Sequence, residues 1–185
     1  MTTIETERLL LRQWTAADKA PYAALNADPA VMEHFPAGLD RAQSDAMVDR
    51  MTATLDERGW GLWAAEERAG GELIGFIGLS VPSFETAFTP CVEVGWRLAA
   101  HHWGHGYAPE GAAAVLAYAF ATVDLPNDEV VSFTTDLNTK SRRVMEKIGL
   151  TRNPGRDFDH PNHPTWSGRH HVLYAIDRAS WQARQ

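Results

Sequence analysis

The chain has 185 residues, of which 44% are hydrophobic and 22% charged, and its formal net charge is −7. This length and composition fit one domain with a real hydrophobic core, so we expect a single domain over residues 1–185. An acidic chain without a lysine-rich run argues against nucleic acid as a partner, because nucleic-acid binding usually needs a basic face. No apolar run approaches the ~20 residues that cross a membrane and no signal peptide is visible, so we expect a cytoplasmic protein with no membrane partner.

The first half of the chain alternates strand and helix signals. Thr15, with Asp18 three positions later, forms a variant of the capping box at the start of a helix. Asp40 is expected to cap a longer helix whose apolar stripe packs in the core. The stripe consists of Ala46, Met47, Met51 and Leu55. The expected elements are strands over residues 8–14, 61–68 and 72–81 and helices over 15–26, 28–32 and 40–57.

The second half continues the alternation around two long loops, residues 82–90 and 153–168. Cys91 adjoins an apolar strand, which favours a buried, inert thiol, and a single cysteine excludes an internal disulfide. The expected elements are strands over 91–98, 129–136 and 170–176 and helices over 109–121 and 138–148. Strands mixed with helices, with at least one crossover, predict an α/β or α+β sheet.

A glycine-rich turn, Trp-Gly-His-Gly-Tyr-Ala over residues 103–108, joins the strand at 91–98 to the helix that follows. The first N–H groups of a helix lack intrahelical partners and its dipole favours negative charge, so a helix start is an anion site. Glycine lets that backbone approach a ligand closely, and Pro109 and Glu110 suit a first helical turn. No lysine follows as in a P-loop, and the third glycine of a dinucleotide fingerprint is absent. The turn therefore predicts a phosphate or pyrophosphate cradle of another kind.

The same turn resembles the pyrophosphate loop of the GNAT acyltransferases, Gln/Arg-x-x-Gly-x-Gly/Ala. Trp103 stands at the first position, Gly106 at the glycine and Ala108 at the final small residue, which is the form common in the RimJ/RimL-like branch. Further segments resemble that branch in the expected order, at residues 6–12, 74–79, 138–150 and 170–174.

The resemblance implies an N-acetyltransferase that transfers acetyl from acetyl-CoA, its co-substrate, to a primary amine in a ternary complex. It implies a mixed, mainly antiparallel sheet flanked by helices, in which two central parallel strands, 91–98 and 129–136, splay apart. The acceptor is a protein N-terminus or a small amine, and no metal is expected. The exposed aromatic content near the C-terminus, with Trp166 and Trp181, is compatible with a homodimer. A non-catalytic acyl-CoA sensor or assembly subunit is the alternative function.

The resemblance also assigns residues to the acetyl-CoA site. The backbone of the first splayed strand would pair with the pantetheine arm, the backbone N–H groups of the glycine-rich turn would bind the pyrophosphate, and an asparagine would contact the arm from the other side. These residues are Trp96, Arg97 and Leu98 for the arm, Trp103, Gly104, His105, Gly106, Tyr107 and Ala108 for the pyrophosphate, and Asn138 for the far side of the arm.

Glu93 is the candidate general base, acting through water, because a carboxylate on an apolar strand is costly unless it is paired or functional. The alternative is a salt bridge to Arg97, which lies on the same face of the strand. Glu85 in the preceding loop is the second candidate base.

Ser141, in the Asn-x-x-Ser helix, is the candidate acid for the leaving thiolate, although a serine in a first helical turn is also common without function. Tyr174 is the alternative acid, and core packing is the simpler interpretation of its place on the last strand. His160 and His163 lie in a proline-rich loop and are expected to face the substrate, with a zinc site as the less favoured alternative.

Overall fold

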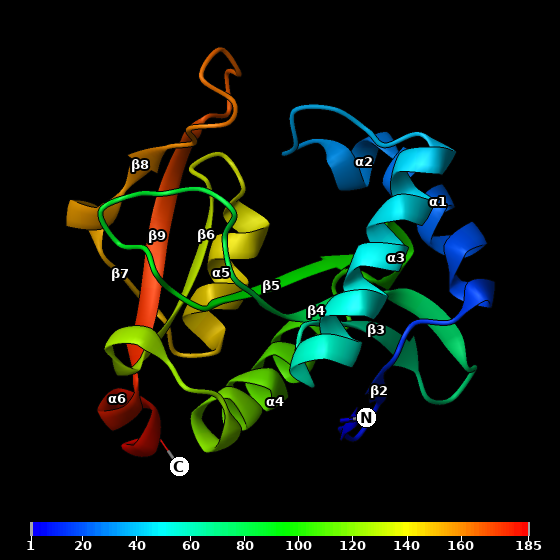
Figure 1. Ribbon diagram of the computed structural model, residues 1–185, viewed down its shortest axis with the longest axis horizontal. Coiled ribbons are helices and arrows are strands. Elements are labelled where there is room, and N and C mark those ends of the chain that lie inside the picture. The colour runs from blue at the N-terminus through cyan, green and yellow to red at the C-terminus, as the bar shows by residue number, and fades with distance from the viewer. Residues whose placement is uncertain (1, 185) are drawn as a thin grey trace.

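The structure, a computed structural model, describes residues 2–184, so Met1 and Gln185 at the ends of the expected range 1–185 lie outside it. Nine strands form one sheet in the order β1-β2-β3-β4-β5-β6-β9-β7, with β8 also paired to β9 (Figure 1). Only β5 and β6 are parallel, and every other pair is antiparallel. The expected mixed, mainly antiparallel sheet is confirmed. The strands are β1 Ile4–Glu5, β2 Leu9–Arg12, β3 Leu62–Glu67, β4 Glu72–Ser80, β5 Glu93–Leu98, β6 Glu129–Thr135, β7 Thr151–Arg152, β8 Phe158–Asp159 and β9 His170–Asp177.

Helices cover both faces of the β1–β5 part of the sheet. On one face, Tyr22 of α1 packs its ring 6.4 Å from that of Phe76 on β4. On the other face, α4 comes so close that a Cβ added at Gly111 would lie 2.4 Å from the side chain of Ile77. Phe76 and Ile77 are neighbours on a strand and point to opposite faces. The α-helices are α1 Lys19–Ala27, α2 Pro29–Met32, α3 Arg41–Arg58, α4 Tyr107–Thr122, α5 Thr139–Lys147 and α6 Arg178–Gln182. No helix within residues 2–184 is long and apolar enough to cross a membrane.

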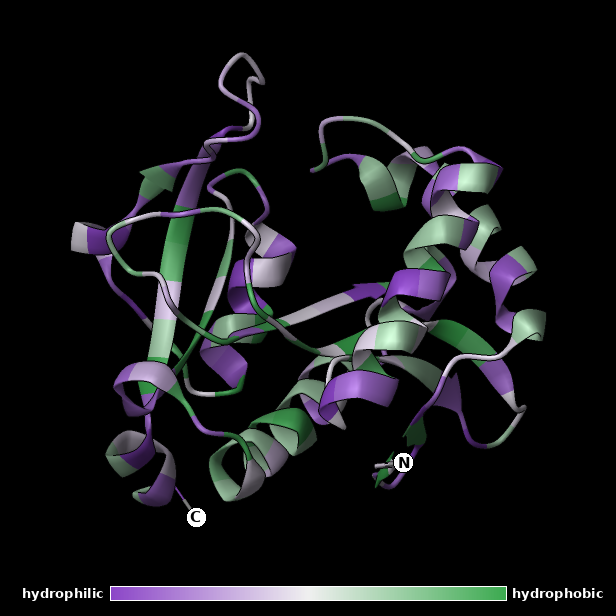
Figure 2. Ribbon diagram, in the orientation of Figure 1, coloured by the Kyte–Doolittle hydropathy of each residue, from purple (hydrophilic) through white to green (hydrophobic). Residues whose placement is uncertain are grey.

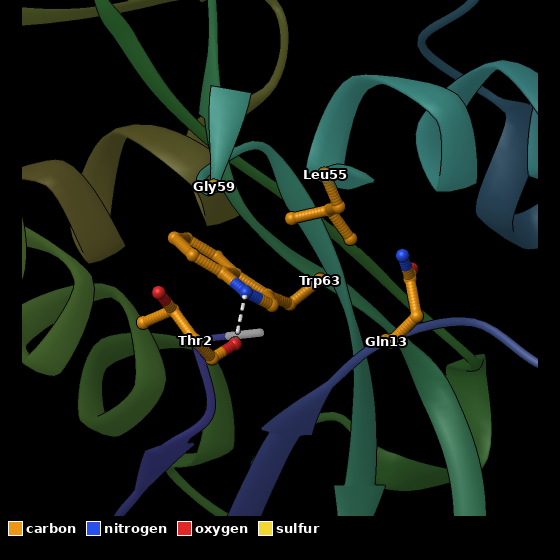
Figure 3. Close-up of a pocket in the computed structure, with 5 residues that line it drawn as sticks. All are labelled: Thr2, Gln13, Leu55, Gly59 and Trp63. Carbon is orange, nitrogen blue, oxygen red and sulfur yellow. Dashed lines mark hydrogen bonds between the residues drawn. The ribbon is translucent and has the colours of Figure 1, made fainter. Parts of the chain in front are cut away.

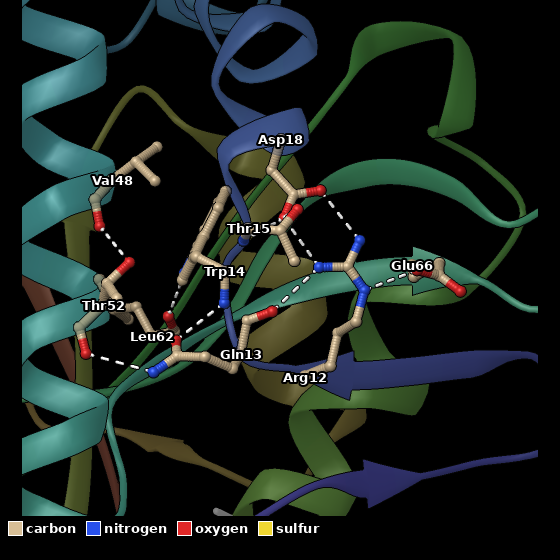
Figure 4. A network of polar contacts seen from close by, with 9 residues as sticks. All are labelled: Arg12, Gln13, Trp14, Thr15, Asp18, Val48, Thr52, Leu62 and Glu66. Atoms are coloured by element: carbon tan, nitrogen blue, oxygen red, sulfur yellow. Dashed lines mark hydrogen bonds and ion pairs between the residues drawn. The ribbon is translucent and has the colours of Figure 1, made fainter.

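The expected helix starts form through their polar caps. Asp40 accepts a hydrogen bond from the Gln43 backbone N–H at 2.8 Å and begins α3, as predicted. Asp18 accepts from the N–H of Thr15 at 2.7 Å and also receives the guanidinium of Arg12 at 2.8 and 2.9 Å (Figure 4). Arg12 reaches Glu66 on β3 as well, at 2.6 Å. This network fixes the start of the helical region against the edge of β2 and β3.

Two expectations about burial are wrong. Ala46 is exposed on α3, whereas Ser44 is fully buried and accepts a hydrogen bond from Asn26 of α1 at 2.9 Å. Residues 166 and 181 were expected as exposed aromatics, but Trp166 and Trp181 are both partly buried, and Trp181 stacks on Phe120 with centroids 5.7 Å apart. The exposed aromatic surface that would favour a homodimer is therefore absent at these two residues.

The core has two parts: the larger includes Val130 of β6 and Val172 of β9, and the smaller includes their neighbours Val131 and Leu173, which point to the opposite face of these strands. The larger part fills the space between the sheet and α1, α3 and α4, and Figure 2 shows the hydrophobic character of α4 and of the middle of β9. The smaller part consists of Phe88, Cys91, Val131 and Leu173. Burial raises the pKa of Cys91 to about 11, so its thiol is protonated at neutral pH, as its sequence context predicts.

A pocket lies beneath the end of α3, where the indole N–H of Trp63 donates to the backbone carbonyl of Thr2 at 3.1 Å (Figure 3). Its volume of about 10 Å³ is close to the room of one water. It is lined by Thr2, Gln13, Leu55, Gly59 and Trp63. It is too small for a substrate, so the functional site lies elsewhere.

Candidate functional site

The two parallel strands β5 and β6 separate almost as soon as they meet. β5 pairs with β4 along its whole length, from Ser80↔Glu93 to Gly75↔Leu98. With β6 it shares one register position, Glu93↔Val131, where the N–H of Val131 donates to the carbonyl of Val92 at 2.9 Å. Beyond Glu93 the strands diverge (Figure 1), which confirms the expected splay.

The alternation of the β ladder identifies which backbone groups of β5 lose a partner. The N–H of Ala99 donates to the carbonyl of Ile74 at 2.9 Å, so the odd-numbered residues of β5 direct their backbone groups to β4. The even-numbered residues Trp96 and Leu98 direct theirs to the side from which β6 has departed. The carbonyl of Leu98 accepts from the Trp103 indole at 2.8 Å, and the β5–β6 register gives Trp96 no partner residue on β6. An extended ligand can therefore pair with Trp96 as an added strand, whereas the backbone of Arg97 faces β4.

The glycine-rich turn opens α4 with its N–H groups unpaired. Gly104 and Gly106 have φ of +82° and +85°, and Gly106 is the N-cap of α4. Both angles lie in the left-handed region that a residue with a Cβ rarely adopts. The first intrahelical bond runs from the Glu110 N–H to the Gly106 carbonyl at 3.2 Å, and the N–H groups of residues 104–108 find no acceptor in the described part of the chain. The predicted anion cradle is therefore present in its backbone geometry.

Hydrogen bonds from the segment between β1 and β2 hold this turn in place, and the sequence alone did not indicate them. Arg8 donates from Nη1 to the His105 carbonyl at 2.8 Å and from Nε to Glu110 at 2.7 Å. Glu110 also accepts from the Arg8 backbone N–H at 2.9 Å and from the Thr6 hydroxyl at 2.6 Å. On the other side, the ammonium of Lys140 on α5 lies 4.1 Å from the ring centroid of Trp103. The turn is thus held by the β1–β2 turn and α4 and contacted by α5.

Glu93 lies where β5 and β6 meet. The alternative interpretation of Glu93, a salt bridge to Arg97, is wrong. Its Oε2 accepts from the Ser80 hydroxyl at 3.0 Å, and no cation pairs with it among residues 2–184. Four residues along a strand span ~13 Å, and the Arg97 side chain turns instead to Asn26, donating from Nη1 at 2.7 Å. Burial raises the pKa of Glu93 to about 7, against the smaller opposing effect of the Ser80 hydrogen bond. A group with this pKa exchanges a proton readily near neutral pH.

The other acid–base candidates occupy different environments. Glu85 is exposed in its loop. Ser141 is partly buried, and its backbone N–H donates to Asn138 Oδ1 at 3.1 Å, so Asn138 caps α5. Tyr174 is 2% exposed, and its hydroxyl is held between Arg142 at 3.3 Å and Glu146 at 3.2 Å. Tyr174 therefore packs in the core, which is the simpler of the two sequence interpretations.

The loop histidines gather at the end of β9 as a cluster of rings. His160 lies with its ring centroid 4.9 Å from that of His163 and 5.3 Å from that of His171. Burial, followed by the neighbouring histidines, lowers the pKa of His160 to about 4, which keeps it neutral. A different group brings candidate metal-ligand atoms within 4.8 Å of one another, namely Glu72, His101 and His102. The carboxylate of Glu72 lies 3.5 and 3.6 Å from the two imidazoles, which is also the arrangement of a surface ion pair.

Comparison with known proteins agrees with this geometry. A family profile described as an acetyltransferase (GNAT) domain matches residues 8–151. FsC-acetyl coenzyme A-N(2)-transacetylase of Aspergillus fumigatus is 31% identical over 190 residues, which cover 99% of this chain and 79% of that protein. The crystal structure of an acetyltransferase from Agrobacterium tumefaciens has 29% identity and a TM-score of 0.76, covering 96% of this chain and 95% of that one. The ribosomal-protein-S5-alanine acetyltransferase of Vibrio fischeri shares the fold, with a TM-score of 0.76 over 98% of this chain and 99% of that one, at 13% identity.

The fold and the site define an acyltransferase with a splayed central sheet. The chain belongs to the GNAT acetyltransferase family, and it is an N-acetyltransferase.

The raised pKa of Glu93 leads us to expect that the free energy of unfolding depends on pH. A carboxyl with an ordinary pKa of 4.5 in the unfolded chain and about 7 in the fold binds its proton more tightly when folded. The free energy of unfolding should therefore fall as pH rises from 4.5 to 7. Glu93→Gln removes this dependence, and its stability relative to the native protein should grow through that window by up to ~3 kcal/mol. Urea denaturation at pH 4.5, 6 and 8 measures it.

Glu85→Gln is the matched control, because Glu85 is exposed and its removal should leave the pH dependence unchanged. Equal pH dependence in Glu93→Gln and the native protein would show that Glu93 is solvated in the fold.

Proposed function

We propose that this enzyme transfers the acetyl group of acetyl-CoA to a primary amine by direct attack in a ternary complex. The observation that carries the proposal is a pair of open backbone sites. One is at Trp96 on the open edge of β5, and the other consists of the N–H groups of residues 104–108 at the start of α4. An amide-containing arm attached to a pyrophosphate matches the two sites.

Each part of acetyl-CoA has a proposed contact. The pantetheine arm pairs with the backbone of Trp96 and Leu98, and Asn138 approaches it from α5. The pyrophosphate sits on the N–H groups of Gly104, His105, Gly106, Tyr107 and Ala108, beside Trp103. The Arg97 backbone, expected from sequence to contact the arm, faces β4, so Arg97 is left out of the proposed acetyl-CoA contacts.

The reaction has three requirements, and Glu93, the open strand and Ser141 are proposed to meet them. An amine must lose its proton to attack, and a lysine amine has a pKa of ~10.4 and an α-amine one of ~7.7–8.0. Glu93, with a pKa of about 7, accepts that proton through a water molecule. A backbone N–H of the open strand near Trp96 stabilises the oxyanion. The Ser141 hydroxyl, which is partly buried, donates a hydrogen bond to the leaving sulfur.

The acceptor is proposed to be a protein N-terminus or a small amine. The Aspergillus relative is named as an N(2)-transacetylase that uses acetyl coenzyme A, and the Vibrio neighbour as an acetyltransferase of an alanine in a ribosomal protein. The sequence form of the glycine-rich turn also supports the RimJ/RimL-like branch.

Turnover tests the proposal directly. The protein incubated with acetyl-CoA and a panel of primary amines and short peptides should release free thiol in proportion to acetylated amine. A thiol reagent and mass spectrometry follow the two products. Binding of CoA without any amine-dependent thiol release across the panel would contradict the proposed reaction.

Gly106→Val should weaken acetyl-CoA binding. The substitution strains a backbone at φ +85° and would place side-chain atoms where the N–H groups face the pyrophosphate. Calorimetry should show a raised Kd for CoA in a protein that remains folded. Gly71→Val is the control for backbone strain, since Gly71 has φ +67° and an added Cβ would meet nothing within 4 Å in the β3–β4 turn. Unchanged CoA affinity in folded Gly106→Val would contradict the assignment of the turn.

Glu93→Gln should lower kcat by ~10²–10⁴-fold. The native rate should rise with pH through about 7, because the carboxylate form is the base and protonation removes it. This acid limb should weaken or vanish in Glu93→Gln, with the Kd for CoA little changed. The pH–rate profile of Glu85→Gln is the comparison. An acid limb retained in Glu93→Gln and lost in Glu85→Gln would transfer the role to Glu85.

A further inference from the structure

Arg97 is a largely buried cation that has no anionic partner in the described part of the chain. Its Nη1 donates to Asn26 Oδ1 at 2.7 Å, which is its one hydrogen bond there. Its Nε is buried and unpartnered. The guanidinium carbon lies 4.1 Å from the ring centroid of Phe35 and 5.7 Å from that of Phe76. The charge is thus surrounded by aromatic rings and one neutral amide.

Other arginines of this protein are paired with the carboxylates that Arg97 lacks. Arg12 pairs with Asp18 at 2.8 Å and with Glu66 at 2.6 Å, and Arg156 binds both carboxylate oxygens of Glu129 at 2.6 and 3.0 Å. Taking a cation out of water costs several kcal/mol unless an anion or a full set of acceptors compensates for the lost hydration. Burial accordingly lowers the pKa of Arg97. An arginine in this environment is poised for an anion supplied from outside the chain.

The guanidinium is also fixed in place before any ligand binds. Asn26 and Ser44 are both 0% exposed, and the Asn26 amide donates to the Ser44 hydroxyl at 2.9 Å, which aims its oxygen at Arg97. Phe35 packs against the face of the guanidinium. Asn26 occupies Nη1, and the buried Nε has no hydrogen-bond partner in the described part of the chain. A guanidinium whose N–H groups are not all paired can donate to a carboxylate or a phosphate.

The position of Arg97 points to the acceptor rather than to acetyl-CoA. Glu93 and Arg97 are both odd-numbered on β5 and share the face that α1 covers, whereas α4 and its phosphate-binding start pack on the opposite face. Their Cα atoms are separated by ~13 Å of extended strand. An amine held near Glu93 can therefore belong to a molecule whose other end reaches Arg97.

We propose that Arg97 binds an oxyanion, a carboxylate or a phosphate, on the acceptor substrate, several bonds away from the amine that is acetylated. This inference rests on the proposed function, because it takes Glu93 to mark the position of the amine. It names an amine that also carries an oxyanion as the substrate class.

Matched acceptor pairs test it. The probes are 4-aminobutyrate and 6-aminohexanoate with their amides, and 3-aminopropyl phosphate with 3-aminopropanol. In at least one pair, the native enzyme should have a higher kcat/KM for the acidic amine than for its neutral partner, through a lower KM. A preference within the carboxylate pairs indicates a carboxylate site, and a preference within the phosphate pair indicates a phosphate site. Arg97→Gln should reduce that acid-to-neutral ratio by roughly 10–10²-fold, as expected for a hydrogen-bonded charge. Arg97→Lys should restore only part of it, because the lysine ammonium lacks the fork.

Asn26→Asp is a second variant that keeps Arg97 and supplies a carboxylate at the distance of the present amide oxygen. It should also lower the ratio of kcat/KM for acidic over neutral amines, because the introduced carboxylate then pairs with the Arg97 guanidinium. Arg50→Gln, which removes an exposed charge on α3, is the control for general electrostatics. No preference for any acid in the native enzyme, or an unchanged ratio in both Arg97→Gln and Asn26→Asp, would overturn the proposal. The proposed function is tested separately by two measurements on the native enzyme, its calorimetric affinity for CoA and its turnover of the neutral amines. Neither measurement depends on an oxyanion in the acceptor.

Discussion

The structure depends on how briefly β5 and β6 pair. A parallel pair of strands inside a sheet normally continues for several residues, because each unpaired N–H or carbonyl group that is buried costs free energy. Here the pairing is limited to Glu93↔Val131, while β5 is fully bonded to β4 and β6 is bonded to β9 over seven residues. The sheet is therefore two antiparallel halves joined at one point. The backbone of Trp96 lies at the interior edge of one half, where an extended ligand can complete its hydrogen bonding.

The glycine-rich turn extends this edge, and its attraction for anions is a backbone property. Arg8, which contacts the turn, is neutralised by Glu110 at 2.6 Å, so it contributes structure more than net charge. Glu110 in turn places in the first helical turn a carboxylate that Thr6 and Arg8 of the β1–β2 turn hold. What remains free at the turn are N–H groups oriented by two positive-φ glycines and the α4 dipole. An anion there meets fixed dipoles that need no reorganisation when it binds.

Local sequence rules predicted the elements that local chemistry determines. The Asp40 cap, the glycine-rich turn and the helix capped by Asn138 all form near the expected residues. The motif resemblance supplied the splay, which no periodicity encodes. The short strands β1, β7 and β8 could not be predicted, because two-residue segments carry no pattern and exist only through their partners.

The errors at the site have a common cause in long-range packing. Glu93 and Arg97 share a face of β5, which suggested a salt bridge, but Asn26 lies 71 residues away in sequence and takes the guanidinium. Asn26 is in turn oriented by Ser44, a polar residue outside the apolar stripe that the pattern of α3 indicated. Side chains that meet across 18 and 71 positions leave no periodic signal in the sequence. Such non-local polar contacts fix the geometry around this face of the strand.

The two-residue period of β5 then explains how one strand can serve two ligands. Its even-numbered residues turn their backbone groups to the open edge, where an arm of amides can bind. Its odd-numbered side chains, Glu93 and Arg97, project from one face, and neither has a neighbour of opposite charge among residues 2–184. Local rules of burial and pairing are satisfied over most of the described chain and fail together along this strand, a pattern typical of functional positions. A six-residue strand that is bonded along its whole length on one edge only thereby separates the backbone edge proposed for the acyl donor from the side-chain face proposed for the acceptor.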